Sequence, residues 1–318
     1  MKVYTINKRT IIKFILILCS LTYGFVVTLQ VQLLFALDSG DIHAYVSFFE
    51  DINMANPANA YALIGDGLFR LGVTFVGSYF NVKPLTVLIG IAFTISSIIY
   101  YIYLEKIRSE KYLIYIFPLL ILTFVSPVVI NIFASGIRSG IAFTILLIGI
   151  VYTKGIIKYI IFGFSGLIHL SMMPIIFMYI LFYTFSKIKI KSKFVIPFFL
   201  LILAAISIVL AAKILNFNTT KVNSSSYYNL LILYLGTLII FTNKNTINNI
   251  YGFISIGLIL VYFIGVIIDL SFSRYIGNSI LFYLFFLINR GGLKSIQTFT
   301  TGFIPFVVFS LSYTLVNF

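Results

Sequence analysis

One arginine and one histidine stand in a stretch of the sequence that is otherwise almost wholly apolar. Arg138 occurs in the run N-I-F-A-S-G-I-R-S-G-I-A, and His169 occurs further along in G-L-I-H-L-S-M-M-P. An ionisable side chain in a membrane segment costs about 2.5–3.5 kcal/mol on insertion scales, so such residues are usually shielded, paired or functional. We therefore expect both side chains to face a cavity that opens on the outer side of a membrane.

Few other ionisable residues lie outside the predicted cytoplasmic loops. Arginine suits a phosphate group, because its planar fork donates two parallel hydrogen bonds and stays charged at any working pH. Histidine can accept a proton near neutral pH and pass it on. Together they could bind an anion and transfer a proton. The residues of this predicted site are Asp38, Asp41, His43, Arg70, Arg138, His169, Asp269 and Arg274.

Each of these residues also has a purely structural interpretation. Arg138 could extend to the outer interface from the start of a helix, although the small residues around it would let other groups approach closely. His169 could be a hydrogen-bonded histidine of the core. The remaining alternatives are an outer salt bridge between Arg274 and Asp269, and helix capping or solvation for Asp38 and Asp41.

The composition excludes a water-soluble protein. Hydrophobic residues make up 61% of the 318 residues and charged residues only 9%, whereas soluble domains carry about 25% charged residues. The mean hydropathy is +1.10. The net charge of +14 does not indicate nucleic-acid binding, because the sequence contains no polar domain that could present a basic patch. With Cys19 as the single cysteine, no intrachain disulfide can form.

Two rules together predict the topology. A helix needs about 20 apolar residues to cross a bilayer, and Lys and Arg gather on the cytoplasmic side. They predict an all-α polytopic membrane protein, a single integral membrane domain over 1–318, with a cytoplasmic N-terminus and an outer loop over about 36–83. The first apolar run is longer than that of a signal peptide, so we expect it to be retained. The predicted transmembrane or part-spanning helices, about eleven, cover about 12–35, 84–104, 112–130, 137–153, a short pair within 156–185, 195–215, 228–242, 250–268, 275–288 and 296–316.

The apolar run over 156–185 is too long for one simple span and too short for two. His169 and Pro174 interrupt it near its middle, which favours two short helices that meet at His169 on the outer side. This arrangement returns the four lysines of 187–193 to the cytoplasm, whereas the alternative, a single kinked helix, would leave them outside. Most of the 22 basic residues are then cytoplasmic, but only two of the eight acids are.

Three short patches give the chain a resemblance to a known family. It resembles the EpsG/Wzy-like family of bacterial polysaccharide polymerases, which serve O-antigen, capsule and exopolysaccharide synthesis. The family often has Gln after the arginine, where this chain has Ser139. The patches are I-R-S-G-I-A (137–142), L-I-H-L-S (167–171) and the pattern D-x-x-D-x-x-x-Y formed by Asp38, Asp41 and Tyr45.

The resemblance implies a function. Members join oligosaccharide units carried on polyprenyl diphosphate at the outer face of the bacterial cytoplasmic membrane, with no metal or other cofactor. It also implies a multi-pass architecture like that of the GT-C lipid-linked glycan transferases. The implied partners are the lipid-linked glycans, membrane lipid, and a flippase and chain-length regulator of the same pathway.

The chemistry of such a transfer suits the predicted site. A hydroxyl of one lipid-linked glycan attacks the anomeric carbon that bears the diphosphate of another. Arg138 and Arg274 could neutralise the leaving diphosphate, while His169, or alternatively Asp41, could act as the base. We expect substrate contacts from the outer side at Asp38, Tyr45, Tyr61, Arg70 and Asp269.

Other functions fit the same residues. A metal-dependent lipid-linked glycosyltransferase could use Asp38 and Asp41 as its acids. A flippase or transporter of lipid-linked oligosaccharide could bind diphosphate through the arginines without chemistry, although the sequence shows no two-fold repeat of the kind many transporters have. A membrane acyltransferase would also use a histidine. Product length separates the polymerase from the flippase, and chelator sensitivity separates it from the metal enzyme.

Overall fold

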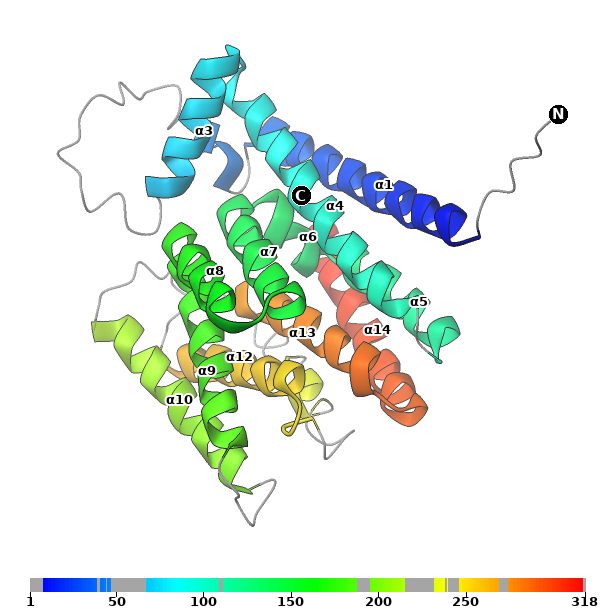
Figure 1. The fold of residues 1–318 in the computed structure, drawn as a ribbon, viewed down its shortest axis with the longest axis vertical. Helices are drawn as coiled ribbons and strands as arrows, with labels where there is room; N and C mark the ends of the chain where they lie inside the picture. The colour runs from blue at the N-terminus through cyan, green and yellow to red at the C-terminus, as the bar shows by residue number, and fades with distance from the viewer. Residues whose placement is uncertain are drawn as a thin grey trace. The chain divides into compact units, whose positions relative to one another are not determined.

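The computed structural model describes residues 8–38, 41–43, 45–46, 67–108, 111–187, 195–214, 232–237, 239, 246–268 and 274–316, and all regular structure in these ranges is helical. The chain divides into two compact units. The first unit comprises Met1–Glu105 and Ile130–Met172, and the second comprises Lys106–Val129 and Met173–Phe318. Figure 1 labels the helices along the chain.

The first unit is built on the N-terminal helices and on a central helical hairpin. Pro84 begins α4, where its fixed φ and missing N–H suit the first turn of a helix. The hairpin consists of α7 (Ile137–Tyr152) and α8 (Gly155–Ile168). Helix α8 ends at Ile168, because His169 adopts an extended conformation with φ −152° and ψ 116°. The elements of this unit are α1 (Lys8–Ala36), α3 (Gly67–Phe80), α4 (Pro84–Ile107), the second part of α6 (Pro127–Ala134), α7 (Ile137–Tyr152), α8 (Gly155–Ile168) and the 3-10 turn η2 (Leu170–Met172).

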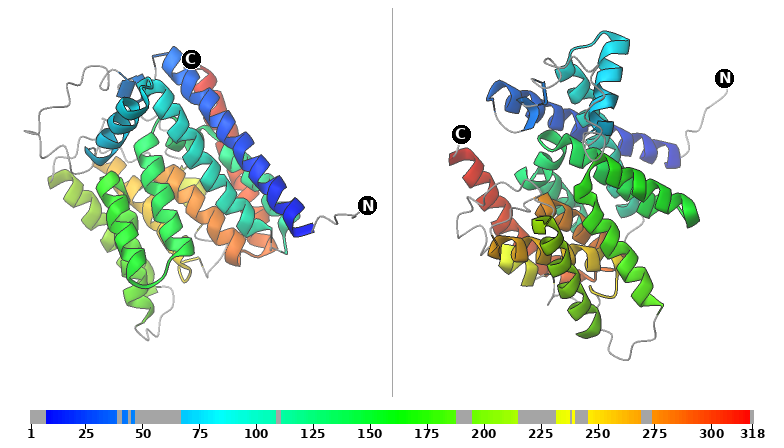
Figure 2. Two further views of the ribbon diagram at one scale, coloured as in Figure 1. Left: turned by 45° about the horizontal axis from the view of Figure 1, so that its top comes forward. Right: turned by 90° about the vertical axis from the view of Figure 1, so that its left-hand side faces the viewer.

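Helices α1 and α4 meet where a glycine leaves room. A Cβ atom at Gly24 would collide with the hydroxyl of Ser97 and would lie 2.9 Å from the carbonyl oxygen of Phe93. One residue away, Tyr23 stacks on Tyr100 with ring centroids 4.8 Å apart. Small residues let helix backbones approach closely in membrane proteins. Gly24 therefore sets the contact between α1 (blue) and α4 (cyan) seen in Figure 2.

The core of the second unit is the antiparallel pair α12 and α13. Tyr251 stacks on Phe285 with centroids 5.3 Å apart, and the hydroxyls of Ser255 and Ser279 lie 3.0 Å apart. Every residue of α13 from Tyr275 to Ile288 is buried, as expected for a helix that is apolar all round. The elements of this unit are α5 (Leu113–Val125), the first part of α6, α9 (Met173–Ser186), α10 (Val195–Ile214), α12 (Ile250–Ile267), α13 (Arg274–Arg290) and α14 (Leu293–Val316).

Several helices are suited to a bilayer. Among the described residues, four are long and apolar enough to cross it, and a fifth span results if α5 and α6 count as one broken span. The long helices are Arg9–Ala36, Pro84–Ile107, Ile196–Lys213 and Ile250–Ile267. These helices support the predicted class, a helical multi-pass membrane protein.

Three predicted segments differ from the structure. The predicted outer loop over 36–83 contains the helix α3, which is too short to be recognised as a span. The predicted helix over 112–130 breaks at Ser126, because the residue before a proline avoids the helical region, and α5 and α6 are bent by 57° there. Helix α6 then continues to Ala134, beyond the predicted end of this helix at 130. Part of the predicted helix over 228–242 lies outside the described residues.

Candidate functional site

Arg138 lies in the first turn of α7 and is held by a tyrosine from a distant part of the chain. Its Nε donates a hydrogen bond of 2.8 Å to the hydroxyl of Tyr45. The carbon at the centre of the guanidinium, Cζ, lies 5.1 Å from the centroid of the same ring, within the range of a cation–π contact. The Arg138 side chain is half-buried. Tyr45 therefore fixes the orientation of a cation in largely apolar surroundings.

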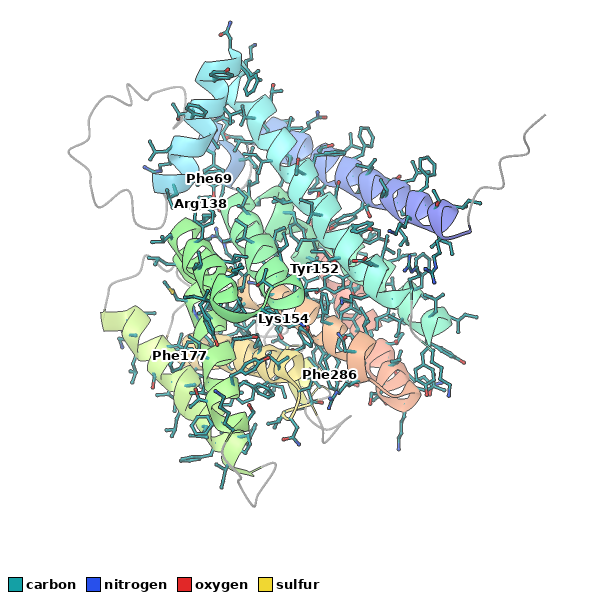
Figure 3. The ribbon with its side chains drawn as sticks, in the orientation of Figure 1. Phe69, Arg138, Tyr152, Lys154, Phe177 and Phe286 are labelled. Atoms are coloured by element: carbon teal, nitrogen blue, oxygen red, sulfur yellow. The ribbon has the colours of Figure 1, made fainter. Side chains whose placement is uncertain are left out.

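Helix α3 brings two further residues to this tyrosine. The ring of Phe69 meets the ring of Tyr45 edge to face, with centroids 5.5 Å apart, which is a favoured geometry for aromatic pairs. Arg70 interacts electrostatically with Tyr45. Figure 3 labels Phe69 and Arg138, which lie between α3 and the start of α7. Residues separated by about 90 positions in sequence thus form one cluster.

The two arginines make this cluster a centre of positive charge. Partial burial lowers the pKa of Arg70 from its usual value, and the attraction of Tyr45 opposes that shift. Gly136 precedes α7 without a side-chain cap, and the first turn contains no acid. The start of a helix carries a partial positive charge that favours a nearby anion by about 0.3–1 kcal/mol. An anion such as phosphate would be held well here.

The predicted acids lie next to this cluster in sequence. The backbone N–H of Asp41 donates to the hydroxyl of Ser135 at 3.3 Å, which joins this segment to the junction between α6 and α7. Asp38 has a positive φ of 51°, and its carboxylate lies 3.0 Å from Nδ1 of His43 in an exposed pair. Of these acids, Asp41 is the one joined to the Arg138 end of α7 by a hydrogen bond.

His169 occupies the break after α8. Its backbone N–H donates to the carbonyl of Ser165 at 3.1 Å, and its own carbonyl accepts from the N–H of Met172 at 3.0 Å. These bonds end α8 and begin η2, so they fix the backbone on both sides of the histidine. The His169 side chain is half-buried. The break therefore falls at the residue where the sequence predicts it.

The antiparallel pairing of α7 and α8 places His169 at the level of Arg138. The hydroxyl of Ser165 donates a buried bond of 2.7 Å to the carbonyl of Ala142. Ala142 lies one helical turn after Arg138, and Ser165 lies one turn before His169. The helices are antiparallel, so one turn back along α7 from Ala142 and one turn forward along α8 from Ser165 lead to the same end of the pair. The two residues that the sequence singles out are thus brought to one end of the hairpin.

Three further predicted residues are not tested by this cluster. Arg274 begins α13 in the second unit, and its side chain is exposed. Asp269 and Tyr61 lie outside the described residues. The grouping of Arg274 with Arg138 stays a prediction.

Sequence reasoning missed three residues of the site. Phe69 and Ser135 are ordinary apolar and small polar residues, and only the folded chain shows that they contact the segment containing Asp41 and Tyr45. Ser165 offered a weak signal, because a hydroxyl four residues before a helix-ending histidine lies on the same helix face. It joins α8 to α7 and so positions His169 relative to Arg138.

Comparisons of the chain with models of protein families, with curated proteins and with solved structures found no match. Within the described ranges, no three His, Cys, Asp or Glu side chains are grouped in a way that could hold a metal ion. The residues around Arg138 are thus the basis for assigning a function.

Proposed function

We propose that this protein is a polysaccharide polymerase that joins oligosaccharide units carried on polyprenyl diphosphate. The observation that carries the proposal is the cluster around Tyr45, where Arg138 is oriented by a hydrogen bond and Arg70 lies close by. Two guanidinium groups in apolar surroundings suit a diphosphate attached to a lipid better than they suit a neutral ligand. The resemblance of the sequence to EpsG/Wzy-like polymerases supports the same substrate class.

The proposal includes a location and an architecture. The enzyme would lie in the bacterial cytoplasmic membrane, with about eleven transmembrane or part-spanning helices, a cytoplasmic N-terminus and a fold like that of GT-C transferases. Transfer would take place at the outer face, as the distribution of Lys and Arg predicts. A flippase and a chain-length regulator would be its pathway partners.

In the proposed reaction, the oxygen of an acceptor hydroxyl forms a bond to the anomeric carbon of the donor glycan. The bond from that carbon to the diphosphate oxygen breaks, and the polyprenyl diphosphate leaves with the electron pair. Arg138 stabilises the charge that develops on the leaving group, and Arg70 adds to the positive potential. The prediction that Arg274 also neutralises the leaving diphosphate stays part of the proposal. So does the prediction that Asp38 and Asp269 bind substrate.

The acceptor hydroxyl must lose a proton during the transfer. His169 is the preferred base, because it lies at the same end of the α7–α8 pair as Arg138. Asp41 is the second candidate, since its backbone is bonded to Ser135 at that end. The two can be separated by comparing His169→Ala with Asp41→Asn, because the base should give the larger loss of rate.

The test is a profile of lipid-linked glycans in cells that carry Arg138→Ala. We expect the rate of polymerisation to fall by about 10²–10³-fold, by analogy with other groups that stabilise a developing anion. Single-unit lipid-linked glycan should accumulate. The matched control is Arg290→Ala, which removes an exposed arginine at the end of α13 and should leave polymer unchanged. Full-length polymer from a normally inserted Arg138→Ala protein would remove Arg138 from the site.

A further inference from the structure

Helix α3 has two faces of different character. Phe69 is 4% exposed and contacts Tyr45, and Val73, one turn later, is also buried. On another face, Phe75 is 68% exposed and Tyr79 is 73% exposed. These two rings stack with centroids 5.9 Å apart, and Leu71 extends the same stripe by one turn. One face of α3 thus packs on the protein, while the other presents a continuous apolar surface.

Helix α3 is shorter than the hydrocarbon core of a bilayer is thick. Its 14 residues extend for about 21 Å at 1.5 Å per residue, which is shorter than the roughly 30 Å hydrocarbon core of a bilayer. A helix of this length with one apolar exposed face is suited to lie in the interface between headgroups and acyl chains.

The connection from α3 to α4 fixes the depth of the helix. The N–H of Val82 donates to the carbonyl of Gly77 at 2.9 Å, and Asn81 has a positive φ of 52°. This is the Schellman arrangement that ends a helix in a defined turn. Pro84, three residues after Asn81, begins a helix long and apolar enough to cross a membrane. The aromatic end of α3 is therefore held close to the start of α4.

We infer that α3 is an interfacial helix whose exposed apolar face, formed by Leu71, Phe75 and Tyr79, inserts into the lipid boundary at the start of α4. Tyr is suited to this position because it gathers at membrane interfaces, and Phe and Leu are typical of the apolar face of interfacial helices. The chain contains no Trp. Lys83, in the link to α4, would lie at the headgroups, where its charge can stay hydrated.

The occupant of this face is lipid rather than another protein. The short link places the face beside the hydrocarbon that surrounds α4, so lipid is the medium already present at that depth. The opposite face of α3 contains Phe69 and Arg70, which contact Tyr45. Insertion of α3 would therefore hold Arg70 and Tyr45 at the membrane boundary. The inference requires the membrane topology but not the proposed polymerase activity.

The absence of Trp from the sequence gives a direct test. The full-length protein with Phe75→Trp is reconstituted into phosphatidylcholine–phosphatidylglycerol vesicles, with lipids brominated either near the headgroup or near the end of the acyl chain. We expect blue-shifted emission, a larger loss of intensity with the shallow bromines than with the deep ones, and little loss with aqueous iodide. Tyr79→Trp repeats the measurement one helical turn further along.

Two control variants calibrate the depth. Phe25→Trp lies on an exposed side of α1, within a candidate span, and should be quenched more by the deep bromines. Phe69→Trp lies on the buried face of α3 and should be insensitive to both lipids. Quenching of Phe75→Trp and Tyr79→Trp by iodide would show that the face meets water. Insensitivity of both to bromine and iodide would show that protein, such as a second copy of the chain, covers it. Either result would overturn the inference.

Discussion

Tyr45→Phe is the most specific perturbation of the candidate site. The substitution removes the hydroxyl that accepts the 2.8 Å hydrogen bond from Nε of Arg138. It keeps the ring, and with it the edge-to-face contact to Phe69 and the cation–π contact with the guanidinium. Any effect therefore reports on the contacts of the Tyr45 hydroxyl with Arg138 and Arg70 rather than on the packing of α3.

The expected size follows from the bond that is lost. A hydrogen bond to a charged group contributes about 1.5–3 kcal/mol, and each 1.4 kcal/mol corresponds to about a tenfold change. If the bond holds Arg138 in the geometry that the leaving diphosphate needs, polymerisation should slow by roughly 10–100-fold. This loss is smaller than the one expected for Arg138→Ala, because the guanidinium itself remains.

The assay is the rate of glycan lengthening by membranes that contain equal amounts of each variant. Tyr159→Phe is the matched control, because Tyr159 is an exposed tyrosine on α8 whose ring contacts Phe162. In a double-mutant cycle with Arg138→Lys, the effect of Tyr45→Phe should largely disappear, since residues in contact are not additive. A wild-type rate for Tyr45→Phe, or full additivity in the cycle, would refute the idea that Tyr45 orients Arg138.

Two further predictions concern stability. Gly24→Val should lower the unfolding temperature in detergent, because overpacking against Ser97 costs about 1–3 kcal/mol. The control is Gly90→Val on α4, where a Cβ meets open space, and its effect should be much smaller. Equal effects of the two substitutions would contradict the tight α1–α4 contact. Asn278→Leu should raise the unfolding temperature, because this side chain is 1% exposed and no described residue gives its Oδ1 a hydrogen bond, which costs about 1–3 kcal/mol. Ser279→Ala, which loses the hydrogen bonds to Ser255, should lower the unfolding temperature instead. A lower unfolding temperature for Asn278→Leu would show that the Asn278 amide stabilises the second unit.

The long helices were predictable because the signal that defines them is local. An uninterrupted apolar run is enough to mark a span, and α4, α10 and α12 lie within a few residues of their predicted bounds. The break at His169 was also predictable, from the length of the apolar run around it. Helix α3 was not, because its 14 residues are too few to register as a span and its apolar face is partly used against the protein.

The contacts of the site depend on folding and were only partly predictable. Arg138 was recognisable because an arginine in an apolar run is costly wherever it lies. Its partner Tyr45 was expected only as a residue that touches substrate, since nothing local in the sequence indicates a bond between residues 93 positions apart. The role of Ser165 was hidden for the same reason, because its acceptor is a backbone carbonyl on another helix.

The most direct measurement uses the purified full-length protein and lipid-linked glycans extracted from a strain that lacks it. If the protein is a polymerase, incubation should convert single-unit glycans into longer lipid-linked chains and release polyprenyl diphosphate, and Arg138→Ala should prevent both. Glycans that stay one unit long in the presence of correctly folded wild-type protein would contradict the proposed function.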